Sequence, residues 1–101
     1  MNKRKYNITT AKAAKPKTNY GKLIVDRLTE AGMTVAGVER LLGYREQKLY
    51  EMINGKTNIN PKDAEALGNL LGDNTLKDKI ISMQSEYQKE IFLKQFEKQK
   101  Q

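Results

Sequence analysis

The sequence predicts an all-α fold in which four or five helices surround one small core. Apolar residues recur at the 3.6-residue spacing of a helix, and no stretch alternates long enough with the two-residue period of a strand. Strong stop signals, most of them glycines, divide the chain into short segments, and 101 residues suit one domain. We therefore expect a disordered basic arm over residues 1–18, a compact helical domain over residues 19–73 and a C-terminal helix over residues 74–101.

The composition argues against an enzyme. The chain has no His and no Cys, which excludes imidazole bases, thiolate nucleophiles and almost every zinc site. No paired-carboxylate or glycine-rich phosphate motif accompanies the remaining acids and lysines. No uncharged apolar run approaches the roughly 20 residues of a membrane-spanning helix. We expect a cytoplasmic protein without enzymatic activity that binds no cofactor or metal and has no membrane partner.

The positive charge is concentrated at the N-terminus. The chain carries 19 Lys and Arg against 12 Asp and Glu, a net charge of +7. Residues 23–101 hold 12 basic and 12 acidic side chains, so the whole excess lies in residues 1–22. A cationic arm of this kind attracts DNA, RNA or acidic lipid surfaces. The alternative is a tail that only keeps the protein soluble.

The first two predicted helices have clear boundaries. Asn19 is a suitable N-cap for the first helix and Gly32 a suitable stop. The second helix begins after Thr34, another good N-cap, and ends at Gly43. The residues expected to face the core are Tyr20, Ile24, Leu28 and Ala31 in the first helix and Val35, Val38, Leu41 and Leu42 in the second.

The third and fourth helices follow the same pattern. The third spans residues 46–53 and stops at Asn54-Gly55. The fourth has Asn60 as its N-cap, Pro61 in the first helical position and Gly72 as its stop. The residues expected to face the core are Leu49, Met52 and Ile53 in the third helix and Ala64, Leu67 and Leu71 in the fourth.

The C-terminal helix has apolar residues on two opposite sides. A first face, which we expect to pack on the domain, consists of Leu76, Ile80, Met83, Tyr87 and Ile91. Ile81, Phe92 and Phe96 project from nearly the opposite side. A helix with one core face cannot bury both sets, so these three residues predict a dimer or partner surface. The last residues, rich in Gln and Lys, are expected to fray.

Two short helices joined by a tight glycine-containing turn can present the second helix to the major groove of DNA. Residues 34–42, the turn at residues 43–45 and residues 46–53 fit this arrangement. The chain here resembles the Cro/lambda-repressor-like helix-turn-helix family, of the xenobiotic-response-element type. The resemblance covers about residues 20–72 and is carried by Met33-Thr34, Val38, Leu42-Gly43, Leu49, Asn54-Gly55-Lys56 and Asn60-Pro61.

A longer stretch is similar to the HigA-type antitoxin branch of that family, through Ile59-Asn60-Pro61, Leu70-Leu71-Gly72 and the segment from Ile81 to Tyr87. The family resemblance implies a transcriptional repressor that binds double-stranded DNA as a homodimer. The narrower one implies an antitoxin with a toxin protein as partner. A phage or mobile-element regulator without a toxin is the other role that we consider.

The resemblance implies that the third helix reads bases and that the flanking loops hold phosphates. At 100° per residue, Gln47, Tyr50 and Glu51 point away from the core side of residues 46–53. Gln47 can bond adenine, and Glu46 or Glu51 can accept from cytosine. The predicted base contacts are Glu46, Gln47, Lys48, Tyr50 and Glu51. The predicted phosphate contacts are Lys3, Arg4, Lys5, Thr34, Arg45, Asn54, Lys56 and Thr57.

Two positions depart from the family pattern. Glu39 stands where a small residue is usual, so we expect its carboxylate to turn to solvent or to pair with Arg40 or Arg45, and the helices to cross more widely. Arg45 stands where Ser or Thr commonly caps the third helix, so this cap is expected to be missing. Glu46 and Glu51 also bring negative charge to the face meant for DNA, and the basic arm is expected to offset it.

Two other functions are consistent with the sequence. The helix-turn-helix can be only a scaffold, with Ile81, Phe92 and Phe96 binding a protein partner. Alternatively, the protein binds RNA through its basic arm.

Overall fold

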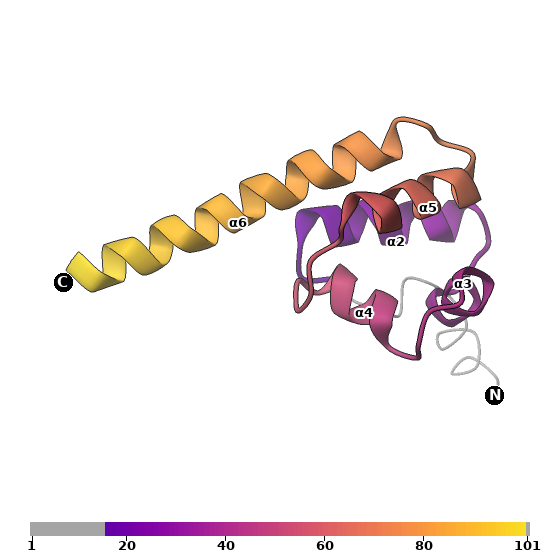
Figure 1. Cartoon of the computed structure of the whole chain (residues 1–101), viewed down its shortest axis with the longest axis horizontal. Helices are drawn as coiled ribbons and strands as arrows, with labels where there is room; N and C mark the ends of the chain where they lie inside the picture. The colour runs from indigo at the N-terminus through magenta and orange to yellow at the C-terminus, as the bar shows by residue number, and fades with distance from the viewer. Residues whose placement is uncertain (1–15, 101) are drawn as a thin grey trace.

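The computed structural model describes residues 16–100, and within this range the protein consists of five α-helices and no strand (Figure 1). The predicted all-α class is therefore confirmed. The helices are α2 (Asn19–Glu30), α3 (Val35–Leu42), α4 (Lys48–Ile53), α5 (Pro61–Leu71) and α6 (Leu76–Lys100).

Side-chain caps fix where three of these helices begin. The Oγ1 atom of Thr34 accepts a hydrogen bond from the amide of Gly37 at the start of α3, and Oδ1 of Asn60 accepts from Asp63 at the start of α5, as predicted. The predicted cap of α2 was wrong by one residue. Thr18, not Asn19, is the N-cap, and its hydroxyl accepts from the amide of Gly21 at 2.8 Å.

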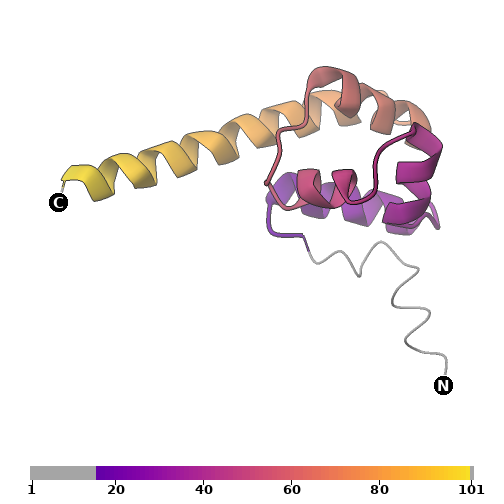
Figure 2. The same ribbon diagram turned by 60° about the horizontal axis from the view of Figure 1, so that its bottom comes forward.

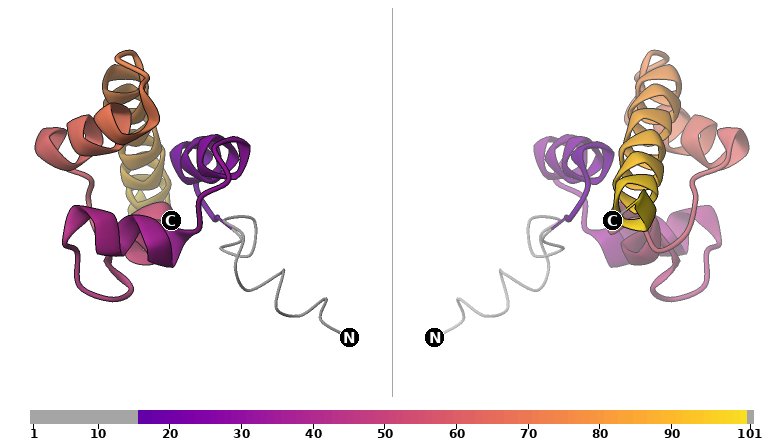
Figure 3. Two further views of the ribbon diagram at one scale, coloured as in Figure 1. Left: turned by 90° about the vertical axis from the view of Figure 1, so that its right-hand side faces the viewer. Right: turned by 90° about the vertical axis from the view of Figure 1, so that its left-hand side faces the viewer.

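Helix α6 packs between α2 and α5 (Figure 3). In Figure 1, α3 is seen nearly end-on while α2 and α5 lie along the page, so α3 runs across the other helices. Helix α4 contacts both α2 and α3. The core between the helices is made of Tyr20, Ile24, Val25, Leu28, Val35, Val38, Leu49, Met52, Ile53, Ile59, Ala64, Leu67, Leu76 and Ile80.

Three residues that were predicted to pack on the core are exposed: Ala31, Leu41 and Ile91. Ile91 is 38% exposed because it belongs to the run from Gln88 to Glu97 of α6, all of which is exposed. Ala31 lies after the last residue of α2, where the chain leaves the helix, and has left the buried face. Leu41 is 67% exposed. The buried side of α3 is formed by Val35, Val38 and Glu39, and Leu41 lies about 110° from its centre at 100° per residue.

Helix α6 is about 37 Å long at 1.5 Å per residue, and its C-terminal part projects beyond the other helices (Figures 1 and 2). Leu76 and Ile80 are buried and Tyr87 is half-buried, whereas all residues from Gln88 to Glu97 are exposed. The prediction for Ile81 was wrong, because this residue is half-buried against the core. The N-terminal part of α6 lies between two helices, which cover more than one of its faces.

Candidate nucleic-acid interface

The segment from α3 through α4 to the following loop contains most of the predicted DNA contacts (Figure 2). Helix α4 begins at Lys48, so the predicted helix over residues 46–53 was two residues too long at its start. Glu46 and Gln47 form a turn instead. Gln47 is exposed and has a φ angle of 78°, which makes it the one non-glycine residue with positive φ among those described. Its direction therefore follows from the turn and not from a helical wheel.

The inner side of α4 is anchored as the sequence predicts, because Leu49, Met52 and Ile53 are buried. Its N-terminus is held by a residue from another helix. The carboxylate of Glu39 on α3 is buried and accepts a hydrogen bond from the amide of Leu49 at 2.8 Å. The expectation that Glu39 turns to solvent or pairs with an arginine was wrong. Its carboxylate takes the place of the missing local cap, because the side chain of Gln47 makes no capping bond.

Arg45 and Glu51, predicted to contact phosphate and base respectively, form an ion pair with each other. The guanidinium of Arg45 also donates to the backbone carbonyl of Glu46 at 3.2 Å, and 61% of its side chain is exposed. The arginine thus neutralises the charge of Glu51 and still faces solvent. Glu46 is exposed, and no ion pair involves it among the described residues.

Lys48, predicted to contact a base, already interacts with two side chains of the protein. Its ammonium lies 3.7 Å from a carboxylate oxygen of Asp63 on α5 and 4.1 Å from the centre of the Tyr44 ring. The hydroxyl of Tyr44 donates to Asp63 at 2.7 Å. Burial, followed by this hydrogen bond, raises the pKa of the Tyr44 hydroxyl above its ordinary value. The three side chains join the turn and α4 to α5.

Three further predicted contacts, Thr34, Tyr50 and Asn54, are only partly exposed. Thr34 uses its hydroxyl oxygen to cap α3. Tyr50 is half-buried and packs against the core. Asn54 is half-buried at the C-terminus of α4, and its side-chain oxygen is buried without a hydrogen-bond partner among the described residues.

The loop after α4 carries two of the predicted phosphate contacts, Lys56 and Thr57. Both side chains are exposed. Their backbone amides donate to the carbonyl of Glu51, at 2.9 Å and 3.4 Å. The predicted contacts Lys3, Arg4 and Lys5 lie outside the described residues.

Sequence reasoning missed the residue that holds the far end of this loop. Gln84 of α6 is buried and bonds both backbone groups of Ile59: its side-chain oxygen accepts from the amide at 2.7 Å, and its side-chain nitrogen donates to the carbonyl at 2.9 Å. The sequence contains an indication of this role: Gln84 is a polar residue one turn from Ile80 on the apolar face of the helix, where a buried side chain needs hydrogen-bond partners.

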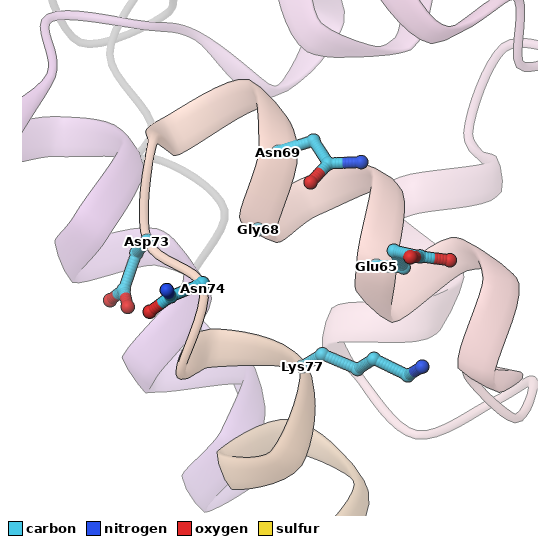
Figure 4. A pocket seen from close by; sticks show the side chains of 6 residues that line it. All are labelled: Glu65, Gly68, Asn69, Asp73, Asn74 and Lys77. Carbon is cyan, nitrogen blue, oxygen red and sulfur yellow. The ribbon is translucent and has the colours of Figure 1, made fainter.

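The surface formed by residues 16–100 has hollows, two of which are distinguished by their lining residues. One, of about 200 Å³, lies beside the turn before α4 and is lined by Ala36, Glu39, Arg40, Tyr44 and Glu46. The other, of about 110 Å³, lies between α5 and the start of α6 (Figure 4). In Figure 4, Asp73 and Lys77 point in different directions, and Asp73 is already engaged by Arg27 and Thr75. The side chains of this second hollow do not converge on one point.

No helix among residues 16–100 is both long enough and apolar enough to cross a membrane. Comparisons of the chain with known protein families, with curated proteins and with solved structures found no match.

Proposed function

We propose that this protein is a sequence-specific DNA-binding transcriptional repressor of the Cro/lambda-repressor-like helix-turn-helix type. The proposal rests on which side of α4 is buried and which residues at its N-terminal end are exposed. Its inner side is buried through Leu49, Met52 and Ile53, while the residues just before it are exposed. In helix-turn-helix proteins, the N-terminal end of the second helix is the part that contacts base edges.

Gln47 is the residue that we assign to base recognition. It is exposed at the N-terminal end of α4 and has the left-handed conformation that glycine adopts most easily. A side chain at such a position costs roughly 1–3 kcal/mol of backbone strain, and strain of this kind clusters at functional sites. A glutamine amide can donate to and accept from adenine in the major groove.

The charged and polar residues around α4 are assigned to contacts with the DNA backbone. Lys56 and Thr57 are exposed on the loop that follows the helix and suit phosphate contacts, together with Arg45 on the turn. The pairing of Arg45 with Glu51 reduces repulsion between the helix and the DNA backbone. The basic residues 1–22 supply sequence-independent attraction.

Selection of binders from a pool of random duplexes tests the proposal. We expect enrichment of a two-fold symmetric site with half-sites about one helical turn apart. Gln47→Ala should weaken binding to the selected site by about 1–3 kcal/mol and leave non-specific binding unchanged. Absence of binding to any duplex at low salt would rule out the proposal.

A second variant separates recognition from folding. Gln47→Gly relieves the left-handed conformation, so the protein should be at least as stable as wild type and still lose discrimination between sites. Gln95→Ala removes an exposed glutamine from the projecting part of α6 and is the matched control. Equal losses in the Gln47 and Gln95 variants would contradict a base contact by Gln47.

A protein-interaction module is the second candidate, favoured by the exposed apolar residues on α6. Ile91, Phe92, Leu93 and Phe96 are between 38% and 65% exposed, and the rings of Phe92 and Phe96 stack with centroids 6.4 Å apart. We propose that this surface contacts a second copy of the chain or, in the antitoxin role, a toxin protein. RNA binding through the arm is distinguished by removing residues 1–17, which should then abolish nearly all nucleic-acid binding.

A further inference from the structure

Helix α6 contacts the loop after α4 at three successive points. The buried amide of Gln84 bonds both backbone groups of Ile59. One turn further along, Tyr87 packs against Gly55, where an added Cβ would lie 3.2 Å from the Tyr87 hydroxyl. The side chain of Gln88 donates to the side-chain oxygen of Asn58 at 2.7 Å.

The loop is thereby fixed at both ends. At its start, the amides of Lys56 and Thr57 are bonded to the carbonyl of Glu51 in α4. At its end, Ile59 is 1% exposed and its backbone is paired with Gln84 as it would be with a neighbouring strand. The side chains between these two anchors, Lys56, Thr57 and Asn58, are exposed.

We infer that Gln84 is a positioning residue for DNA binding, which holds the loop so that Lys56 and Thr57 meet the phosphate backbone. The inference rests on the proposed function and names a residue that does not itself touch DNA. The physical reason is preorganisation: a loop that is already ordered loses little conformational entropy on binding. Without Gln84, two buried backbone groups lose their partner and the loop must be ordered by the DNA instead.

Gln84→Met tests this inference, because methionine has a similar shape and no hydrogen-bonding amide. The full-length variant is measured against the selected duplex and an unrelated duplex over a range of salt concentrations, at a temperature where circular dichroism shows it fully folded. We expect affinity for both duplexes to fall about tenfold and the slope of log K against log salt to decrease in magnitude by about 1, the loss of one phosphate contact. The ratio of the two affinities should not change. Ser85→Ala, an exposed neighbour, is the control.

A double-mutant cycle shows whether Gln84 acts through Lys56. If it does, the loss of affinity in Gln84→Met combined with Lys56→Gln should be clearly smaller than the sum of the losses in the two single variants. Additive losses would overturn the inference, because they would mean that the two residues act separately. If Gln84→Met does not fold, Gln88→Ala removes an exposed contact of the same loop and should reduce the salt slope in the same direction.

Two outcomes separate this inference from the proposed function. Failure of the wild-type protein to bind any duplex overturns the function and the inference with it. Wild-type binding together with an unchanged salt slope in Gln84→Met overturns the inference alone. Amide hydrogen exchange without DNA adds a direct readout: the amide of Ile59 should exchange faster in Gln84→Met, and an unchanged rate would show that Gln84 does not hold the loop.

Discussion

At the scale of single residues, Thr18 and Gly21 set the contact between α2 and α4. The hydroxyl of Thr18 accepts from the amide of Gly21 and donates to the carbonyl of Ile53 at the C-terminus of α4, both at 2.8 Å. Thr18 therefore belongs to the folded domain and not to the basic arm in which the sequence placed it. Gly21 lies so close to α4 that an added Cβ would be 2.1 Å from the carbonyl oxygen of Ile53.

Gly21→Ala should therefore be strongly destabilising, by about 3 kcal/mol or more, because two backbones must move apart. Gly32→Ala is the matched control. Its added methyl group meets nothing within 4 Å, and only its φ angle of 71° is unfavourable, so a loss of about 1–2 kcal/mol is expected. Denaturant unfolding measures both values. A smaller loss at Gly21 than at Gly32 would contradict this close approach of the helices.

At the scale of elements, α4 is too short to be stable by itself. Six residues are far below the length at which isolated helices form in water, so its neighbours must hold it in place. Burial of Leu49, Met52 and Ile53 fixes its inner side, and the carboxylate of Glu39 fixes its N-terminus. A residue of α3 thus sets the orientation of the helix that we assign to DNA.

Glu39→Ala should lower the free energy of unfolding by about 2–3 kcal/mol, because the buried amide of Leu49 loses a charged acceptor. Glu39→Gln keeps an acceptor oxygen and should lose less. Glu86→Ala removes an exposed glutamate of α6 and should change stability by no more than about 0.5 kcal/mol. The role of Glu39 would be disproved if the alanine and glutamine variants were equally stable.

At the scale of the whole molecule, an ion pair joins the first and last helical regions. Arg27 of α2 pairs with Asp73, which lies just before α6. Hydrogen bonds from the hydroxyl and the amide of Thr75, with a smaller effect of Arg27, hold the pKa of Asp73 below its ordinary value. A lowered pKa in the folded state stabilises the protein above the unfolded-state value, and this contribution disappears as the pH falls through the folded-state value.

Asp73→Asn should accordingly lower the thermal unfolding midpoint at about pH 7. The difference from wild type should shrink as the pH falls from about 4, the ordinary pKa of an Asp side chain, toward the lower pKa of Asp73 in the folded protein. Thermal unfolding followed by circular dichroism across this range measures the effect, with the exposed Asp78→Asn as the control. A difference that is independent of pH would mean that the charge of Asp73 does not contribute.

The projecting part of α6 extends the molecule to 51 Å along its longest axis. Replacing Phe92 and Phe96 together by Ala should shift any dimer toward monomer in sedimentation equilibrium, because these two large apolar side chains are 65% and 47% exposed on α6. Leu41→Ala is the matched control, since Leu41 is an apolar residue of α3 that is 67% exposed, close to the value for Phe92. A shift caused by Leu41→Ala alone would assign dimerisation to the surface of α3 instead.

The helical class, the end of each of the four short helices and most of the core can be predicted from the sequence alone. Local rules suffice for these features: capping residues, glycine stops and 3.6-residue spacing act within a few residues of each other. Thr34, Asn60 and Pro61 fulfil their predicted roles because a cap needs only the helix that follows it.

The start of α4, the roles of Glu39 and Gln84, and the burial of Ile81 depend on tertiary contacts. Each depends on a partner far away in the chain. Glu39 bonds a residue ten positions later and Gln84 one that is 25 positions earlier, and no local pattern specifies such a pair. A helical wheel predicts side-chain directions only for residues that are part of the helix. Glu46 and Gln47 precede the first residue of α4, so the wheel does not apply to them.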